Sequence, residues 1–356
     1  MTFPNSVAGG AGPPAIRLVN LTDPPDCVTD NPAGVIVASG SDLSTPRAEY
    51  WLGRATFTLT DIDAGDRRVI TVESVAAALD DLAQRLERRP LAAAVCDDVL
   101  RAVDPAAPTL TGVITESLAY STLQSGPEFA RWLAERGPAT MPGSATPVQS
   151  DRDGDTLYIR FNRPQRHNAF STEMRAALLE ALTVARLDPS ITGVVLTGNG
   201  PSFCSGGDLA EFGTFADPPS AHLARTRYSP ALSLDELTRR LGRRCRAEVH
   251  GQVLGSGLEM AAYCGRVRAH PDAVLGLPEL SIGLLPGAGG TVSITRRIGR
   301  WRTGYLVLSG RTIDAATALR WGPVDEVDQT DPADEVDVTG EADEVDVTGE
   351  ADEAEA

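Results

Sequence analysis

Two glutamates stand in surroundings that suit proton transfer. Glu259 lies in the first turn of a predicted helix between Leu258 and Met260, and Glu279 follows Pro278 within the apolar stretch VLGLPELSIGLL. A carboxyl group among apolar neighbours has a raised pKa, which suits general acid–base catalysis near neutral pH. Each glutamate also has a simpler interpretation: Glu259 as a charge at a helix N-terminus, and Glu279 as a turn residue that faces water.

Two glycine-rich turns could bind an oxygen that carries negative charge. They read FCSGGDLAEF (203–212) and LGSGLEMAA (254–262), and each leads into an apolar helix start. Glycines let backbone N–H groups approach a ligand closely, and a helix N-terminus favours negative charge. One N–H from each turn, aimed at the same oxygen, would form an oxyanion hole. For either motif alone, an ordinary strand-to-helix turn is an equally good interpretation.

Other chemistry fits these turns less well. Ser256 could be a nucleophile, but Leu254 stands where the G-x-S-x-G elbow needs its first glycine, and the four histidines form no pattern that supplies a base. Neither GSGLEM nor GAGGTV completes the G-x-G-x-x-G of a dinucleotide-binding loop. All 32 basic residues are arginine, so the absence of lysine excludes a catalytic Schiff base.

The net charge of −17 is concentrated at one end of the 356-residue chain. Residues 325–356 contain 15 acidic and no basic residues, so the rest of the chain carries a net charge of only −2. The segment ADEVDVTGE occurs at 333–341 and again at 342–350. So polar a repeat cannot bury enough apolar surface to offset its ordering entropy, and we expect a disordered acidic tail over 328–356. Such a tail repels nucleic acid.

Composition also limits the class of protein. No run approaches the roughly 18 to 20 apolar residues that a membrane span needs, and the N-terminus does not resemble a secretion signal. The five cysteines are scattered and form no C-x-x-C pair, which argues against disulfides and structural zinc. We therefore expect a cytoplasmic protein that has no metal site and binds neither membranes nor nucleic acid.

The first half of the chain has the pattern of a small α+β domain over 15–137, after a flexible start at 1–14. Apolar runs at 16–21 and 34–38, with alternation through 56–59, predict strands. Val75, Leu79, Leu82 and Leu86 form the apolar stripe of a helix, and a second helical pattern runs from about 114 to 133. Segment 138–154 is rich in Pro, Gly, Ser and Thr, which predicts a linker.

The second half alternates strands and helices. Alternation at 157–161 predicts a half-buried strand, and Ser171 is placed to cap a helix. A buried strand at 191–197 precedes a glycine-rich turn and another helix, and a last helix covers about 314–321. This order predicts a layered α/β domain.

Five segments of this half, in order, resemble the enoyl-CoA hydratase/isomerase, or crotonase, superfamily. The resemblance covers about 155–327, which is roughly half of the residues, and implies the layered β/α spiral of that family. It rests on these segments: FNRPQRHNAF, FCSGGDL, HGQVLGSGLEMA, GLPELSIGLLPGAGGT and LSGRTIDAATALRWGPVDEV.

The resemblance implies a role for each matching position. The N–H groups of Gly207 and Ser256, or of Gly257 beside it, would hold the thioester oxygen of an acyl-CoA. Glu259 and Glu279 would activate a water for Cβ and handle the proton at Cα, with Gly287 near that water. The resemblance also implies no cofactor, since CoA belongs to the substrate, and a homo-oligomer that is a trimer or a hexamer. The positions that would contact CoA are Arg163, Asn168, Ala169, Ser205 and Leu209.

Three functions remain open at this point. The retained glutamates favour a hydratase that adds water to a 2-enoyl-CoA, and an enoyl-CoA double-bond isomerase is the first alternative. The second alternative is a non-catalytic crotonase-like assembly or regulatory subunit. It is favoured by the polar segment RRCRAEV before HGQVLGSG and by the lack of the family's C-terminal helices. We expect the segment 116–133 to replace those helices as a cover for the acyl pocket.

Overall fold

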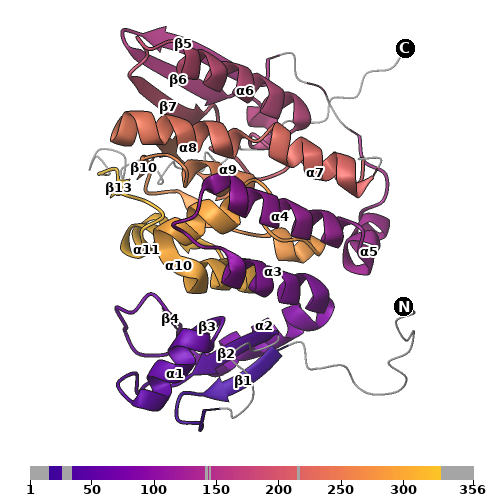
Figure 1. Ribbon diagram of the computed structural model, residues 1–356, viewed down its shortest axis with the longest axis vertical. Coiled ribbons are helices and arrows are strands. Elements are labelled where there is room, and N and C mark those ends of the chain that lie inside the picture. Colours follow the sequence, from indigo (N-terminus) through magenta and orange to yellow (C-terminus); the bar gives the residue numbers. More distant parts are fainter. Residues whose placement is uncertain (1–15, 26–33, 141–142, 144–145, 215–216, 330–356) are drawn as a thin grey trace, which may run out of the picture.

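The computed structural model describes residues 16–25, 34–140, 143, 146–214 and 217–329 (Figure 1). Its strands form a four-stranded, a six-stranded and a three-stranded sheet with helices packed around them, a mixed α/β fold. The predicted flexible start and nearly all of the predicted acidic tail lie outside the described residues. Within those residues, no helix combines the length and the apolar character that crossing a membrane requires.

The N-terminal sheet is parallel, with its strands in sequence order. The three strands predicted for this region are confirmed as β1 (Ile16–Asn20), β2 (Val35–Ser39) and β3 (Phe57–Thr60), and β4 (Val69–Thr71) follows them. Parallel neighbours need a crossover connection, which α1 (Pro46–Arg54) provides between β2 and β3.

Four helices follow this sheet. The predicted stripe forms α2 (Val75–Arg88), in which Leu82 and Leu86 are buried. The prediction of a single helix from about 114 to 133 is wrong, because the chain forms two helices there, α4 (Thr109–Gln124) and α5 (Pro127–Arg136). Proline cannot continue a helix but suits its first position, so α5 begins anew at residue 127. Between α2 and α4 lies α3 (Pro90–Ala102).

The six-stranded sheet carries the second half. Its helix α6 (Thr172–Leu187) begins as predicted, with the Ser171 side chain accepting the N–H of Met174. The prediction of a linker over 138–154 is wrong for its last part, because residues Val148–Asp153 form the strand β5, which pairs antiparallel with β6 (Thr156–Phe161). From one edge to the other the strands are β13 (Glu326–Val327), β10 (Arg266–Ala269), β8 (Cys245–Val249), β7 (Gly193–Gly198), β6 (Thr156–Phe161) and β5 (Val148–Asp153).

Polar residues are compatible with the central position of β8. Cys245, Ala247 and Val249 are buried, whereas Arg246 and Glu248 alternate with them and pair at 2.9 Å. The alternation leaves the apolar residues on the buried side of the sheet. The polar segment that favoured a non-catalytic subunit is therefore an ordinary half-buried strand.

The remaining elements surround the two glycine-rich turns. The prediction of a helix directly after 203–212 is wrong, because residues after Asp208 form turns and the next helix begins at Pro218. The elements are β9 (Gln252–Leu254), β11 (Val274–Gly276), β12 (Ile313–Asp314), α7 (Pro218–Arg227), α8 (Pro230–Leu241), α9 (Ser256–Ala261), α10 (Gly290–Ser309) and α11 (Ala315–Trp321), with 3₁₀ helices at Pro164–Arg166, Gly242–Arg244 and Glu279–Ile282.

Both halves of the chain share one hydrophobic core. Phe57 of β3 packs edge to face on Tyr305 of α10, with ring centroids 5.5 Å apart. Arg296 of α10 donates to the carbonyl of Ala107 and to the hydroxyl of Thr109, both at the start of α4. Figure 1 shows α3 and α4 lying against the orange and gold elements of the second half. The first half is therefore packed into the fold rather than suspended from a linker.

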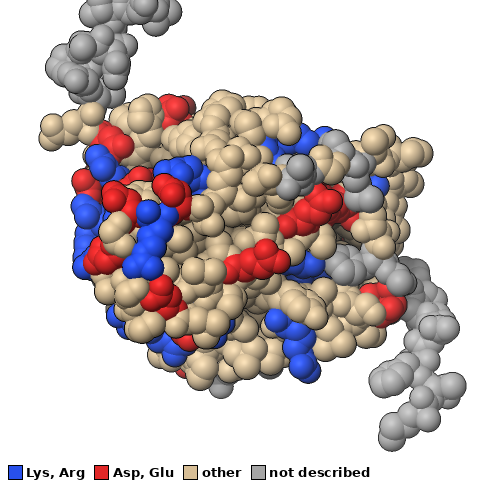
Figure 2. All heavy atoms as spheres, turned by 90° about the horizontal axis from the view of Figure 1, so that it is seen from above, with Lys and Arg blue, Asp and Glu red and all other residues tan. Residues whose placement is uncertain are grey.

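The surface carries mixed charge. On the face seen in Figure 2, acidic and arginine side chains lie beside one another, without one broad patch of a single sign. This mixture is consistent with the net charge near zero that remains once the acidic end is set aside.

Candidate active site

The two glycine-rich turns lie side by side because β9 pairs with the first of them. The N–H of Cys204 donates to Gln252, and the N–H of Leu254 donates back to Cys204, at 3.0 and 2.9 Å. A Cβ on Gly257 would lie 2.6 Å from the carbonyl oxygen of Cys204, so only glycine allows this approach.

Each turn places a backbone N–H at the cavity that has no hydrogen-bond partner in the described part of the chain. Among the described residues, the N–H groups of Gly207 and Ser256 donate to no other group. Ser256 opens α9, so its N–H is one of the free donors at a helix start. The preceding residues, Gly206 and Gly255, have φ angles of 96° and 47°, which glycine adopts readily. Both donors line the same cavity.

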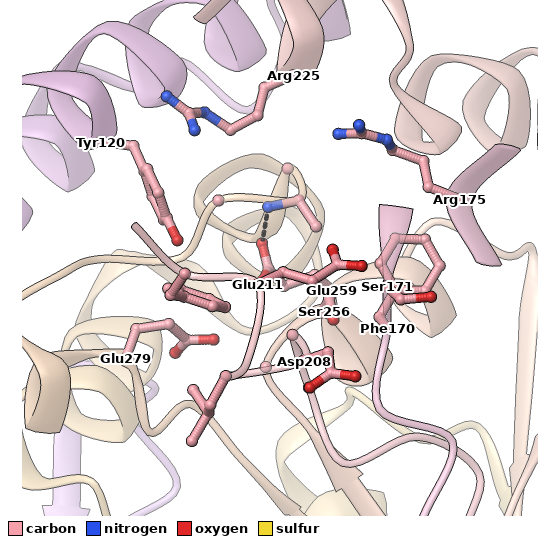
Figure 3. Close-up of a pocket in the computed structure, with 18 of the residues that line it drawn as sticks. Tyr120, Phe170, Ser171, Arg175, Asp208, Glu211, Arg225, Ser256, Glu259 and Glu279 are labelled. Atoms are coloured by element: carbon pink, nitrogen blue, oxygen red, sulfur yellow. Dashed lines mark hydrogen bonds between the residues drawn. The ribbon is translucent and has the colours of Figure 1, made fainter. Parts of the chain in front are cut away.

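This cavity has a volume of about 280 Å³ and walls from both halves of the chain (Figure 3). The second half contributes seven of the predicted site residues to the wall: Ser205, Gly207, Leu209, Ser256, Glu259, Glu279 and Gly287. The first half contributes residues of α4, including Glu116 and Tyr120. The segment expected to cover the pocket therefore does line it.

Glu259 is held by the backbone at the start of α10. Its Oε2 accepts the N–H groups of Ala288 and Gly290, both at 2.7 Å, and the residue is 1% exposed. Burial raises the pKa of Glu259 to about 7, although these backbone hydrogen bonds oppose the shift. Such a carboxyl group can exchange a proton near neutral pH.

Glu116 of α4 holds the same segment from the other side. Its Oε1 accepts the N–H of Gly289 at 2.7 Å, and its Oε2 accepts the N–H and the hydroxyl of Thr291 at 2.9 and 2.7 Å. Burial, and then the charge of Glu259, raises the pKa of Glu116 to about 8. Four consecutive N–H groups, from 288 to 291, are thus divided alternately between two carboxylates.

Glu116 was not among the predicted site residues, because the motifs that indicate chemistry all lie in the second half of the chain. A signal exists, since Val113, Glu116 and Tyr120 follow a helical spacing of three and four, and all three are buried. An acidic residue at a core position of an amphipathic helix needs a partner. Here the partners are the backbone N–H groups at the start of α10.

Glu279 differs from Glu116 and Glu259 in the hydrogen bonds of its carboxyl group. It opens the 3₁₀ helix Glu279–Ile282, and its Oε2 is inaccessible and has no hydrogen-bond partner among the described residues. Burial, followed by the charges of Glu259 and Glu116, holds its pKa well above the usual range. A buried polar atom left without a partner costs stability, so its retention points to a function.

Tyr120 closes the wall beside Gly287. A Cβ at position 287 would lie 2.4 Å from the tyrosine ring, so a glycine is required for α4 to approach the segment. In Figure 3 the Tyr120 side chain lies on the same side of the cavity as Arg225. The guanidinium carbon of Arg225 is 4.4 Å from the centre of that ring.

A sequence model described as enoyl-CoA hydratase/isomerase matches residues 152–339. The chain belongs to this family. Its relatives include a protein named "Probable enoyl-CoA hydratase" of Mycobacterium bovis, 36% identical over 183 residues, which are 51% of this chain and 68% of that protein. The 2,3-dehydroadipyl-CoA hydratase of Escherichia coli is 34% identical over 180 residues, again 51% and 68% of the two chains.

Solved structures of the family match the same share of the chain. That of enoyl-CoA hydratase from Thermoplasma volcanium has 34% sequence identity and covers 53% of this chain and 74% of that one, with a TM-score of 0.45. The family match begins at residue 152, so Glu116, Tyr120 and the rest of α4 lie before it. As a family member the protein is an enzyme, an enoyl-CoA hydratase or isomerase, and the non-catalytic alternative is set aside.

The residues expected at CoA divide into two groups. Ser205 and Leu209 line the cavity, but Arg163, Asn168 and Ala169 do not. Arg163 is 2% exposed and its Nη2 donates to Asp208 at 2.9 Å, so its guanidinium is committed to the interior. The Asn168 side chain donates to two main-chain carbonyls and is fully buried. These residues shape the loop before α6.

Across the described ranges, no three His, Cys, Asp or Glu side chains gather in a way that could hold a metal ion. The cavity combines three carboxyl groups of raised pKa with two free backbone donors, which is the equipment of acid–base catalysis.

We expect Glu116→Gln to weaken the fold most at low pH. At about pH 5, where Glu116 is protonated, the exchange of one carboxyl oxygen for an amide nitrogen removes an acceptor and should lower the free energy of unfolding by about 1–3 kcal/mol. Because the pKa of Glu116 is raised in the folded state, ionisation through about pH 8 destabilises the parent but not the variant. The difference in the free energy of unfolding between parent and variant should therefore become smaller as the pH rises to about 9.

Denaturant unfolding at these pH values measures this difference. Glu87→Gln, at an exposed position of α2, serves as the control and should match the parent throughout. A difference that stays constant or widens with pH would show that Glu116 is already ionised in the folded protein at low pH.

Proposed function

We propose that the protein adds water across the double bond of a 2-enoyl-CoA thioester. The observation that carries this proposal is one cavity that holds both the free N–H groups of Gly207 and Ser256 and the carboxyl groups of Glu259 and Glu279. Family members named enoyl-CoA hydratase support the same reaction class.

The thioester oxygen would accept the two backbone N–H groups. Attack on Cβ moves electrons through the conjugated system and builds negative charge on this oxygen, which the donors stabilise. One such donor is typically worth about 10² to 10³ in rate. Preorganised donors need not reorient during the reaction, so the rigid turns that hold Gly207 and Ser256 suit this task.

The two glutamates would divide the transfer of protons. Glu259, with its pKa near 7, is partly ionised at neutral pH and can take a proton from the attacking water as its oxygen bonds to Cβ. Glu279, with its pKa well above the usual range, stays protonated and can give its proton to Cα. The product gains one water in total, and proton exchange with solvent then restores both carboxyl groups.

One observation favours the isomerase as a second candidate. Oε2 of Glu259 is already engaged by two backbone N–H groups, whereas Glu279 has a free carboxyl oxygen. A double-bond shift needs a single group that removes a proton from one carbon and returns it to another. Glu279 alone could do this.

Three further expectations of the family resemblance are part of this proposal. Ser205 and Leu209 would contact the CoA arm at the wall of the cavity, while Arg163, Asn168 and Ala169 would act by shaping the loop beside it. No cofactor is required by this mechanism, and assembly into a trimer or hexamer remains a proposal.

The test is product analysis with the purified full chain. We expect 2-enoyl-CoA esters to gain the mass of one water, and 3-enoyl-CoA esters to remain unchanged. Conversion of 3-enoyl to 2-enoyl esters without hydration, detected by the absorbance of the conjugated thioester, would assign the isomerase instead. If neither class of ester is converted, the proposed function is wrong.

A further inference from the structure

Two arginines in the cavity have no acidic partner. Arg175 lies in the first turn of α6 and Arg225 lies near the end of α7, and both line the cavity. Among the described residues, neither has a carboxylate oxygen within 4.0 Å, whereas Arg163 and Arg166 share Asp208. In Figure 3 both arginines lie across the cavity from Glu279 and Asp208.

Arg225 is fixed in place by uncharged groups alone. Its Nε donates to the hydroxyl of Ser117 at 3.2 Å, one terminal nitrogen donates to Gln124 at 3.0 Å, and the other donates to the hydroxyl of Ser121. All three partners belong to α4, and the guanidinium stacks over the ring of Tyr120. These contacts orient the positive charge without neutralising it.

The side chain of Arg175 makes no hydrogen bond with any described residue, although its backbone N–H donates to Ser171. Burial lowers its pKa, and the nearest acidic influence is Glu211, whose Oε2 already accepts the N–H and hydroxyl of Thr172. Burial also lowers the pKa of Arg225, while the charges of Tyr120 and Glu116 raise it and the charge of Arg175 lowers it. The two positive charges therefore repel each other within a partly dehydrated pocket, an arrangement that costs stability unless an anion joins them.

We propose that Arg175 and Arg225 bind a carboxylate at the far end of the acyl group, so that the substrate is a CoA monothioester of an unsaturated dicarboxylic acid. This inference rests on the proposed function, because it assigns the acyl group of the same site. The planar guanidinium matches a carboxylate in a bidentate arrangement, which lysine cannot reproduce.

The position of Arg225 favours a carboxylate of the acyl group over a phosphate of CoA. Its guanidinium lies on one face of the Tyr120 ring, and the same ring touches Gly287, the position expected near the attacking water. Only an aromatic ring thus separates Arg225 from the reacting end of the substrate. The phosphates of CoA are attached beyond the whole pantetheine arm, on the other side of the thioester.

The test compares pairs of 2-enoyl-CoA esters with equal carbon number, one ending in a methyl group and the other in a carboxylate. We expect kcat/KM to favour the carboxylate ester by on the order of 10- to 100-fold, as for a hydrogen bond to a charged group. Arg175→Met should bring the ratio of the two values close to one. Arg225→Lys keeps the positive charge but loses the planar guanidinium, so it should reduce the ratio of the two kcat/KM values in part.

Arg175→Met is the primary variant because the Arg175 side chain has no hydrogen bond to lose, so the fold should persist. Arg227→Met, at an exposed position of α7, is the matched control and should keep the parent's ratio. A parent ratio near one, or a ratio unchanged in Arg175→Met, would overturn the proposal. Weaker binding of free CoA by Arg175→Met, with both esters affected equally, would assign the arginines to a phosphate and overturn it as well.

A binding measurement separates this inference from the proposed reaction. Saturated acyl-CoA esters cannot be hydrated, so calorimetry with a matched methyl and carboxylate pair reports the anion site alone. If hydration is absent but the parent still prefers the saturated carboxylate ester, and Arg175→Met does not, the site stands and the reaction is wrong. If hydration is present without any such preference, the reaction stands and the site is wrong.

Discussion

Glu279→Gln should lower kcat for hydration by about 10² to 10⁴, the range that general acid–base groups contribute. The variant keeps the shape of the side chain but cannot give a proton to Cα. Because Oε2 of Glu279 has no partner in the described structure, the exchange should disturb nothing else. Steady-state turnover of a 2-enoyl-CoA, together with thermal unfolding, measures both effects.

Three comparisons make this result specific. Binding of a saturated acyl-CoA should be nearly unchanged in Glu279→Gln, since binding relies on backbone donors and CoA contacts. Glu259→Gln should also lose hydration but should melt at a lower temperature, because it disturbs the N–H groups of Ala288 and Gly290. Glu180→Gln, exposed on α6, should behave as the parent. Full turnover by Glu279→Gln would remove Glu279 from the mechanism.

A chain that begins at residue 146 should fail to fold and should show no turnover. It lacks buried side chains that complete the shared core, among them Phe57, Leu100 and Val113, which are at most 3% exposed. Burying one such side chain is worth about 1.5–3 kcal/mol. The total stability of a domain is only about 5–15 kcal/mol, so the loss of several is decisive.

Solubility, far-ultraviolet circular dichroism and thermal melting of the shortened chain provide the measurement. As a control, residues 1–140 expressed together with the shortened chain should restore a soluble, cooperatively melting complex, because the missing surface returns in trans. A shortened chain that is soluble by itself, melts cooperatively and turns over substrate at the parent's rate would show that the first half is an accessory.

The sequence predicted the second half well because its signals are local. Ser171 caps α6 as expected, and Met174 and Leu178, four residues apart on that helix, are buried in the core. The glutamates and the glycine turns, singled out by their family spacing, line one cavity, and their catalytic roles stay a prediction. Nothing in the local sequence, however, shows that residues after Asp208 form turns rather than a helix, since their apolar character fits either.

The first half was less predictable because its site contribution depends on contacts distant in sequence. Glu116 binds Thr291 across 175 residues of chain, a pairing that no local pattern records. The break between α4 and α5 was readable from Pro127, but the apolar residues on both sides masked it. The role of Arg225 likewise depends on α4, which approaches it only in the folded protein.

The hydrogen bonds from the start of α10 to Glu116 and Glu259 can form only late during synthesis on the ribosome. Helix α4 is synthesised first, and Glu116 on it cannot accept the N–H of Thr291 until residue 291 has been added to the chain. At 5–20 residues per second, a gap of 175 residues corresponds to roughly 10 to 35 s. During this time Val113 and Tyr120 of α4 and the buried side chains of β3 have no cover, so we expect nascent chains of this enzyme to bind a chaperone.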